Sequence, residues 1–431
     1  MSWRAYPQLD EQVYWKQLNN GLTLAVVPRK GFQKKLAYFV TDYGSIHTDY
    51  VLDGKIKEAP AGVAHYLEHK LFDMPRGEIS AEFAALGANP NAFTSYDMTA
   101  YYFSCTENFD RCLQLLLEFV STPYFTEESV AKEQGIIGQE IDMTADNPDT
   151  QVFENLMTAM YGNHPIRVPI LGTRESIAQI TPQVLLDCHR AFYAPGNMIL
   201  CIIGDVKADQ VEKIAVEVLG NQKHTAGTKL RNWEEDIVCA QKTVWAQMEV
   251  AMPMFQMGFK CEPIGKGEQA VRREIIGDLA AEALFGESSA LYLKLYEEGL
   301  IDSSFGGGFE TIDGMAMLTA SGDSDDPEAV RDAILRQAKM LLQSGIPEKD
   351  FLRMKRSALG RRIRDLDSFD STCFRLCAYY FSEFDYFDFP RVFRSVEERE
   401  VLAFINRVVT DDRCCLSVIT PKEQEVTHES Q

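Results

Sequence analysis

Two histidines and a glutamate lie within five positions of a mostly apolar run, HYLEHKLF, at residues 65–72. On a helix, His65 and His69 are about one turn apart and share a face, so both imidazoles can reach one ion with Glu68 beside them. Zinc accepts imidazole nitrogens readily and leaves a coordination position for water in catalytic sites. Composition alone would produce an H-x-x-acid-H pattern about 0.02 times in a chain of this length, so the motif predicts a metal site.

A third protein ligand is expected, because catalytic zinc sites with two histidines commonly add a carboxylate. The helix predicted after Thr126 carries Glu133 and Glu140 seven residues apart, and therefore on nearly the same face. Either carboxylate could bind the metal, and both could instead be solvated helix charges. Gly135 and Gly138 weaken this helix, which suggests a close approach to the motif helix. The order H-x-x-E-H is itself a metallopeptidase signature.

The elements that must position this motif follow from hydrophobic periodicity. Alternating apolar residues predict strands at 21–28, 35–44 and 100–106. Helical spacing predicts helices at 107–120 and 125–141, the second of which begins with a capping threonine and acidic residues. The motif helix lies between the second and third of these strands.

The same order of elements returns in the second half of the chain. A strand predicted at 316–324 is followed by helices at 325–345 and 346–366, and Ser321 takes the place that Ser104 has in the first half. An internal duplication explains this repetition. The predicted fold is therefore α+β, with two homologous domains that each contain an antiparallel-rich sheet covered by helices.

The limits of the two domains follow from a break in periodicity. Residues 219–236 are polar and aperiodic, so they are the predicted linker between a zinc-bearing domain at 1–220 and a homologous domain at 237–431. The segment EIIGDLAAEALF, at 274–285, is the counterpart of the motif helix and contains no histidine. Only the first domain is therefore predicted to bind the metal.

Composition excludes several classes of partner. The 431 residues carry a formal net charge of −21, which disfavours binding to nucleic acid and to anionic membranes. From the composition of the first residues we expect no export signal, and no apolar run in the sequence reaches membrane-spanning length. Its ten cysteines lack a C-x-x-C spacing, which indicates reduced thiols. We expect a soluble cytoplasmic protein.

Six segments of the chain form a recognisable set: HYLEHKLF, GANPNAFTSYDMTAYYF, EQGIIGQEI, YGNHPIRVPILGTRESI, FYAPGNMILCIIGDV and ALFGESSALYLKLYEEGLI. Together they resemble the pitrilysin or insulinase family of inverzincin peptidases, and the chain length is similar to that of a bacterial branch related to mitochondrial processing peptidase. Carried over residue by residue, the resemblance implies that His65, His69 and Glu140 bind Zn2+. It also implies that Glu68 is the general base and that Glu133 lies beside the ligands without binding the metal.

The resemblance implies a zinc endopeptidase that hydrolyses small unfolded peptides or precursor segments within a chamber formed by two opposing halves. In the family an extended peptide adds to a strand, here residues 92–103, with Asn91, Ala92, Phe93 and Thr94 at the substrate. This segment could also be an ordinary internal strand. The alternative function is a non-catalytic or partner-dependent subunit of a peptidase-like complex, and the intact set of metal-site residues favours the enzyme.

The resemblance also implies a partner chain. Active relatives carry an arginine and a tyrosine that reach across the chamber, and these positions correspond here to Tyr296 and Asp302. A carboxylate would repel a developing oxyanion. We therefore expect a dimer, and specifically a heterodimer with a related chain that supplies the Arg/Tyr pair. A locally shifted alignment would instead assign this role to Arg375 with Tyr379 or Tyr380.

Other conspicuous residues have structural interpretations. FGGGF, at 305–309, is interpreted as a flexible turn, because no phosphate-loop residues follow it. Asp325 or Asp326, before Pro327, predicts a helix start. His164 is interpreted as structural, and Cys373 and Cys377 as core thiols.

Overall fold

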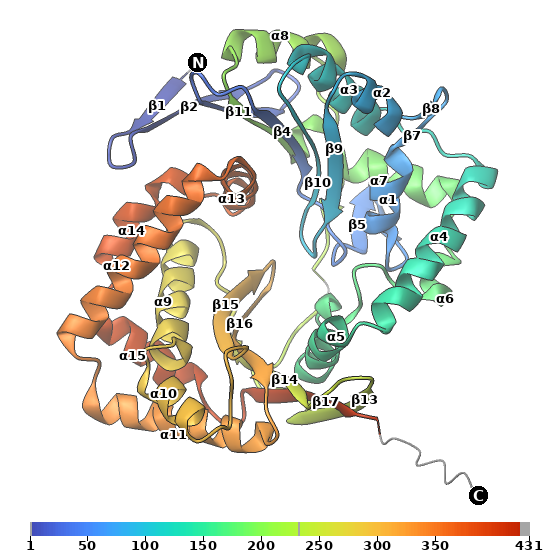
Figure 1. The fold of residues 1–431 in the computed structure, drawn as a ribbon. Helices are drawn as coiled ribbons and strands as arrows, with labels where there is room; N and C mark the ends of the chain where they lie inside the picture. Colours follow the sequence, from blue (N-terminus) through green and yellow to red (C-terminus); the bar gives the residue numbers. More distant parts are fainter. Residues whose placement is uncertain (1, 232, 423–431) are drawn as a thin grey trace, which may run out of the picture.

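Two separate sheets organise the chain, one in the upper half of Figure 1 and one in the lower half. The computed structural model describes residues 2–231 and 233–422. The first sheet has seven strands, in the order β1 (Ser2–Tyr6), β2 (Glu11–Gln17), β3 (Thr23–Pro28), β11 (Met198–Gly204), β4 (Lys35–Thr41), β10 (Thr99–Cys105) and β9 (Asn89–Thr94). The second has five, in the order β13 (Thr243–Met248), β17 (Cys414–Pro421), β14 (Met254–Cys261), β16 (Met315–Asp323) and β15 (Gly306–Ile312).

The two sheets repeat one pairing scheme. The parallel pair β3–β11 is matched by the parallel pair β13–β17, and the antiparallel run β11-β4-β10-β9 is matched by β17-β14-β16-β15. Ser104 pairs with Leu36 near the start of β4, and Ser321 pairs with Gln256 near the start of β14. The predicted fold, α+β with two homologous antiparallel-rich domains, is confirmed.

Helices cover one face of the first sheet because their apolar stripes match it. In α3, buried residues recur at helical spacing, from Phe109 to Val120. The Thr126 hydroxyl accepts a hydrogen bond from the backbone N–H of Ser129, and the backbone N–H of Thr126 donates one to the Ser129 hydroxyl. This capping box confirms the predicted start of the following helix. The helices of this half are α1 (Val63–Leu71), α2 (Ser80–Ala85), α3 (Phe109–Ser121), α4 (Glu127–Ala145), α6 (Arg174–Ile177), α7 (Pro182–Phe192) and α8 (Ala208–Leu219).

The second sheet has its own helical cover. Asp326 accepts a hydrogen bond from the backbone of Ala329, with Pro327 in the first turn, so the predicted helix start is confirmed. The helices of this half are α9 (Gly267–Phe285), α10 (Ala290–Glu297), α11 (Pro327–Ser344), α12 (Glu348–Arg364), α14 (Phe389–Ser395) and α15 (Glu398–Val408).

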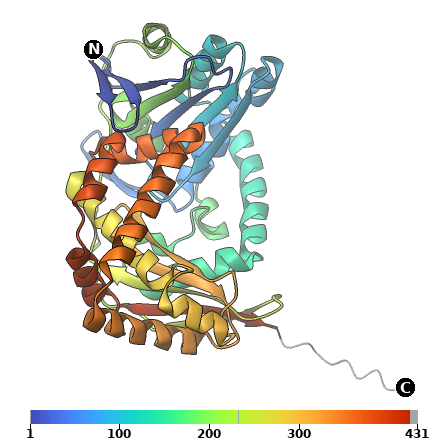
Figure 2. The same ribbon diagram turned by 60° about the vertical axis from the view of Figure 1, so that its left-hand side comes forward.

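Each half gives one helix to the other half. Helix α5 (Pro148–Met160) follows α4 in sequence but packs on β13, β14 and β17 of the second sheet. Helix α13 (Phe369–Phe381) follows α12 but packs on β4 and β11 of the first sheet. The two halves therefore share buried cores, and they lie one above the other in both views of the ribbon (Figures 1 and 2).

The segment between the sheets, residues 219–236, is anchored at several points. Strand β12 (Thr228–Lys229) pairs with β5 (Asp49–Leu52), which also pairs with β6 (Lys55–Glu58). Farther along, Glu235 accepts hydrogen bonds from the backbone N–H groups of residues 162–164. It also forms an ion pair with Lys260, with 2.6 Å between the charged atoms. This segment therefore contacts both halves.

The interpretation of FGGGF as a flexible turn is wrong. Residues 306–312 form β15, the edge strand of the second sheet, paired along its length with β16. A Cβ on Gly307 would lie 2.4 Å from the carbonyl oxygen of Thr319 and from the ring of Phe285. Glycine is therefore needed here for close packing against β16 and α9.

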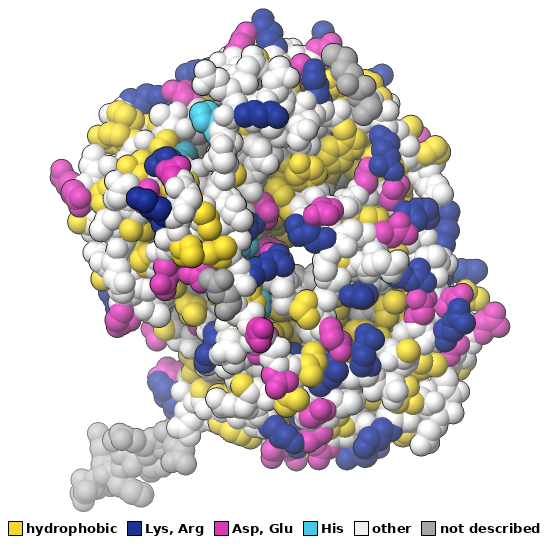
Figure 3. Space-filling model, turned by 180° about the vertical axis from the view of Figure 1, so that it is seen from behind, with side chains coloured by type: hydrophobic (Ala, Val, Ile, Leu, Met, Phe, Trp, Pro, Cys, Tyr) yellow, Lys and Arg dark blue, Asp and Glu magenta, His cyan; other side chains and the backbone are white. Residues whose placement is uncertain are grey.

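The remaining structural interpretations agree with the fold. All ten cysteines are buried and free, including Cys373 and Cys377 in α13. His164 is fully buried and accepts a hydrogen bond from the backbone of Ile166. None of the helices in residues 2–231 and 233–422 is long and apolar enough to cross a membrane. Acidic and basic side chains are interspersed over the face shown in Figure 3.

Candidate metal centre

Helix α1 holds the histidines of the motif on one face, as the spacing predicts. The two imidazole rings are 4.6 Å apart at their centroids. The Nε2 atoms of His65 and His69 each lie 3.7 Å from a carboxylate oxygen of Glu140 on α4. One ligand atom from each of these three residues lies within 4.8 Å of the other two. The structure therefore brings together the three residues predicted to bind the metal.

Helix α4 is fixed against α1 by a buried contact. The hydroxyl of Tyr66, which is fully buried, donates to the backbone oxygen of Val130 at 2.5 Å. Three residues farther along α4, Glu133 accepts a 3.0 Å hydrogen bond from Nδ1 of His69. A carboxylate has no proton to give, so Nδ1 carries the hydrogen, and Nε2 is the ring nitrogen left to bind a metal. Glu133 thus contacts His69 at Nδ1, whereas Glu140 faces the Nε2 atoms of both histidines.

Protonation at the centre follows from burial and neighbouring charge. Burial, and then the charge of His69, lowers the pKa of His65 to about 3, so this imidazole is neutral. Burial disfavours the charged form of His69, but the hydrogen bond to Glu133 and the nearby carboxylates outweigh it and raise its pKa. Burial also raises the pKa of Glu68, partly offset by a hydrogen bond from Thr94.

Two imidazole nitrogens and one carboxylate oxygen form a donor set that fits zinc and is typical of catalytic rather than structural zinc sites. Glu140 is 40% exposed, so the centre can be reached from solvent. The remaining side chain of the motif, Glu68, lies on the same helix and contacts the neighbouring strand. The hydroxyl of Thr94 donates to its Oε2 at 2.6 Å.

The prediction of a single substrate strand at residues 92–103 is wrong. The segment is a hairpin, in which Asn91, Ala92, Phe93 and Thr94 lie on β9 and the chain turns at 95–98 before β10. The alternating pattern concealed the turn because it continues on both sides of it. Strand β9 is the edge of the sheet, whereas β10 is internal, so the strand with an unpaired edge beside α1 is β9.

The suggested close approach of α4 to α1 at its glycines is also wrong. A Cβ on Gly135 would meet nothing within 4 Å. A Cβ on Gly138 would lie 2.8 Å from a guanidinium nitrogen of Arg174, which comes from α6 and not from the motif helix. The helices approach instead through Tyr66, whose side chain reaches the α4 backbone.

The positions considered for the Arg/Tyr pair have other contacts. Tyr296 is 54% exposed and stacks on Tyr292, and the carboxylate of Asp302 accepts from the backbone and hydroxyl of Ser304. In the alternative set, Tyr379 donates to Glu274, Tyr380 shares a hydrogen bond with Thr23, and Arg375 lies 3.7 Å from Asp365. None of these contacts involves the metal centre.

One further residue belongs to the centre although the motif does not require it. Lys70 directly follows His69, is fully buried, and lies 4.0 Å from Glu133. The sequence feature that could have identified Lys70 is its charge, because it is a single charged side chain between His69 and the apolar pair Leu71 and Phe72. Its spacing of four residues from Tyr66 places it on the face of α1 that contacts α4.

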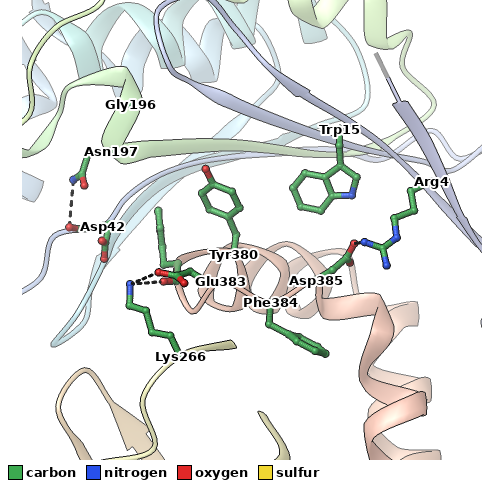
Figure 4. A pocket seen from close by; sticks show the side chains of 11 residues that line it. Arg4, Trp15, Asp42, Gly196, Asn197, Lys266, Tyr380, Glu383, Phe384 and Asp385 are labelled. Atoms are coloured by element: carbon green, nitrogen blue, oxygen red, sulfur yellow. Dashed lines mark hydrogen bonds and ion pairs between the residues drawn. The ribbon is translucent and has the colours of Figure 1, made fainter. Parts of the chain in front are cut away.

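A separate cavity of about 600 Å³ lies at the seam between the halves (Figure 4). Most of its charged side chains are paired, as in Arg4 with Asp385 at 2.7 Å and Lys266 with Glu383 at 3.8 Å. Among the described residues, none predicted for the metal centre lines it. The lining residues are Arg4, Trp15, Asp42, Gly196, Asn197, Lys266, Tyr380, Phe381, Glu383, Phe384 and Asp385.

Comparison with known proteins identifies relatives over the whole length of the chain. Residues 50–174 match the family model described as insulinase (peptidase family M16), and residues 179–358 match the model described as peptidase M16 inactive domain. The uncharacterized zinc protease YmfH of Bacillus subtilis (strain 168) is 37% identical, over 97% of this chain and 98% of that protein. The mitochondrial-processing peptidase subunit beta of Caenorhabditis elegans is 29% identical, over 48% of this chain and 44% of that protein.

A solved structure has the same fold. The M16-like peptidase of Alicyclobacillus acidocaldarius superimposes with a TM-score of 0.91 at 32% identity, over 96% of this chain and 99% of that one. The matching relatives include several that are named zinc proteases.

Proposed function

Because this chain belongs to the insulinase (M16) family of zinc proteases, we propose that it is a zinc endopeptidase acting on small unfolded peptides or precursor segments. Zinc is the cofactor of this family. The observation that supports the proposal is the convergence of His65, His69 and Glu140, whose ligand atoms lie within 4.8 Å of one another. A subunit used only for binding or assembly has no need of this arrangement.

The proposed chemistry uses side chains that converge on one edge of the first sheet. Zinc, when bound by the three ligands, supplies Lewis acidity that polarises a peptide carbonyl and activates water. Glu68 accepts a proton from the attacking water and donates it to the leaving amine. Burial makes Glu68 a stronger base, and Thr94 orients its carboxylate. The unpaired edge of β9 binds the main chain of the peptide.

We further propose that full activity requires a related partner chain. Tyr296 and Asp302 stand where active relatives are expected to carry an Arg/Tyr pair, and an aspartate cannot donate a hydrogen bond to an oxyanion at neutral pH. The C. elegans relative is named as a subunit, which supports a paired arrangement. A heterodimer with a chain that carries the pair would complete one catalytic centre.

The second candidate function is that of a non-catalytic subunit. The match of residues 179–358 to a model described as an inactive domain favours it. That match lies outside the metal-site residues and covers much of the second half, in which α9 lacks histidine and Glu274 pairs with Arg362 at 2.8 Å. The metal-site residues of the first half are intact, so we favour the peptidase. The ten buried free thiols support a reducing compartment, and we propose the cytoplasm.

Metal content and peptidase activity, measured on the same variants, test the proposal. We expect about one zinc per chain, because the three ligands define a single site. The variant E68Q should keep the metal and lose activity by about 10²–10⁴-fold, the usual contribution of a general base. The variants H65A and E140A should lose the metal. Unchanged hydrolysis by E68Q would contradict the assignment of the base, and loss of zinc from E133A but not E140A would contradict the assignment of the third ligand.

A further inference from the structure

The motif helix contains a buried cation next to the metal centre. The side chain of Lys70 is 0% exposed. Its ammonium pairs with the carboxylate of Asp73, just beyond the end of α1, and lies 4.0 Å from Oε2 of Glu133 on α4. A buried charge is tolerated only where opposite charges or hydrogen bonds compensate it. The ammonium therefore lies between two carboxylates. The side chain of Asp73 is 40% exposed and that of Glu133 is 14% exposed.

Both carboxylate oxygens of Glu133 face a positively charged or hydrogen-bonding partner. Oε1 of Glu133 accepts the hydrogen bond from Nδ1 of His69 at 3.0 Å, and Oε2 faces the ammonium of Lys70. The Oε1 hydrogen bond holds Glu133 on the Nδ1 side of His69, and Oε2 lies 4.0 Å from the ammonium of Lys70, within ion-pair range. Glu140 lies two turns farther along α4, and its two oxygens face Nε2 of His65 and of His69. Glu133 and Glu140 thus have different tasks.

The placement of Lys70 follows from the geometry of α1. Tyr66 and Lys70 are four residues apart and lie on the face that contacts α4. On the facing helix, Val130 and Glu133 are three residues apart, and the Tyr66 hydroxyl is bonded to the Val130 carbonyl. Lys70 is therefore held against Glu133 by the same helix contact that sets the spacing of α1 and α4.

We propose that Lys70 is a positioning residue of the metal centre. Its ammonium keeps Glu133 in the orientation that accepts the Nδ1 proton of His69, which fixes Nε2 of His69 toward the metal and leaves the third ligand position to Glu140. The inference rests on the proposed function, because it assumes that His65, His69 and Glu140 bind zinc. If Lys70 were only a structural ion-pair partner of Asp73, it would affect folding stability but not metal affinity.

Zinc affinity of the full chain, measured by competition with a chromophoric chelator, distinguishes these roles. The variant K70M removes the charge and keeps a side chain of similar volume. Loss of an interaction that orients a metal ligand typically weakens metal binding about 10–100-fold, so we expect K70M and E133Q each to raise the zinc Kd by about this factor. Because Lys70 acts through Glu133, the double variant K70M/E133Q should bind zinc no more weakly than E133Q alone.

The matched control is D73N, which removes the exposed partner of the same ammonium. D73N should lower folding stability, because it removes one partner of a buried charge. Its zinc Kd should stay within about fivefold of the wild-type value, since Lys70 keeps its contact with Glu133. If K70M does not fold, K70Q serves in its place, with folding checked by circular dichroism.

Additive losses in the double variant, or a normal Kd for K70M beside a weakened E133Q, would overturn the role of Lys70 while leaving the ligand set intact. Unchanged zinc binding by H65A would overturn the ligand set, and the proposed function together with it.

Discussion

The hydroxyl of Thr94 donates a 2.6 Å hydrogen bond to Glu68, and this bond joins the edge strand β9 to the motif helix α1. The residue proposed as the base and the strand proposed to bind substrate are therefore one connected unit. A peptide added to β9 would lie beside the carboxylate that is proposed to act on it. Positioning of this kind contributes to catalysis because small displacements of a reacting group are costly.

The variant T94V should lower kcat/KM by about 10–100-fold. It removes one hydrogen bond to an ionised group, typically about 1.5–3 kcal/mol, while keeping the shape of the side chain. T94S is the matched control, because it keeps the hydroxyl and should retain most of the activity. Zinc content should be unchanged in both variants. Steady-state kinetics on one peptide would test this, and wild-type activity in T94V would show that the bond does not position the base.

Features of the centre that are local in sequence could be predicted. His65, Glu68 and His69 share one helix, so their spacing alone places them together. The choice between Glu133 and Glu140 could not be made from spacing, because both lie on one face of α4. It depends on the angle between α1 and α4, set by the contact of Tyr66 with the α4 backbone. That contact has no signature in the sequence.

Nonlocal arrangements were harder to predict. The repeated order of elements predicted the duplication, but not the exchange of α5 and α13, since an apolar helix face does not specify which sheet covers it. The hairpin of β9 and β10 was missed because no glycine or proline marks its turn at residues 95–98. The run of glycines in β15 suggested a turn, whereas close packing of Gly307 against Thr319 and Phe285 accounts for one of them.

The three glycines of β15 should differ in their tolerance of a side chain. The variant G307A should lower the free energy of unfolding by about 1–3 kcal/mol, because its Cβ would lie 2.4 Å from a backbone oxygen and the strand must shift. G308A is the control, since a Cβ there meets nothing within 4 Å. Urea unfolding of both variants tests this. Equal stability of the two would show that packing at Gly307 is looser than the structure indicates.

The link between Glu235 and Lys260 should make stability depend on pH. Burial opposes ionisation of Glu235, but Lys260 and three backbone N–H groups outweigh it and lower its pKa from 4.5 to about 2. A lowered pKa means that the folded state favours the carboxylate. The stabilisation is therefore fully present above about pH 5 and is lost as the pH falls toward 2.

The variant E235Q should reduce the free energy of unfolding at pH 7 by about 3 kcal/mol, the usual effect of breaking a buried pair. Lys260 is only 2% exposed and would lose its charged partner. The difference between wild type and E235Q should be constant from pH 7 to pH 5.5 and should shrink at pH 4 and pH 3. E234Q, at an exposed neighbouring position, is the control and should show no such trend. A difference at pH 3 as large as that at pH 7 would exclude the carboxylate of Glu235 as its source.

The isolated chain should be a poor peptidase. Loss of one oxyanion donor typically lowers the rate by about 10²–10³-fold. In this chain Tyr296 and Asp302 occupy the two positions at which an arginine and a tyrosine are expected. Addition of a related chain from the same source, one that carries the Arg/Tyr pair, should raise kcat/KM by at least about 100-fold. Size-exclusion chromatography should show a complex of the two chains.

Variants of each chain show which residues contribute to the peptidase activity of the complex. In the mixed assay, Y296F and D302A in this chain should have little effect, because their contacts lie within their own segment. Replacing the arginine or the tyrosine of the partner should abolish the gain, while E68Q in this chain should abolish activity altogether. The partner's groups and Glu68 would then act on the same substrate from opposite sides. Full activity of the isolated chain, unaffected by Y296F and D302A, would show instead that this protein completes its catalytic centre without a second chain.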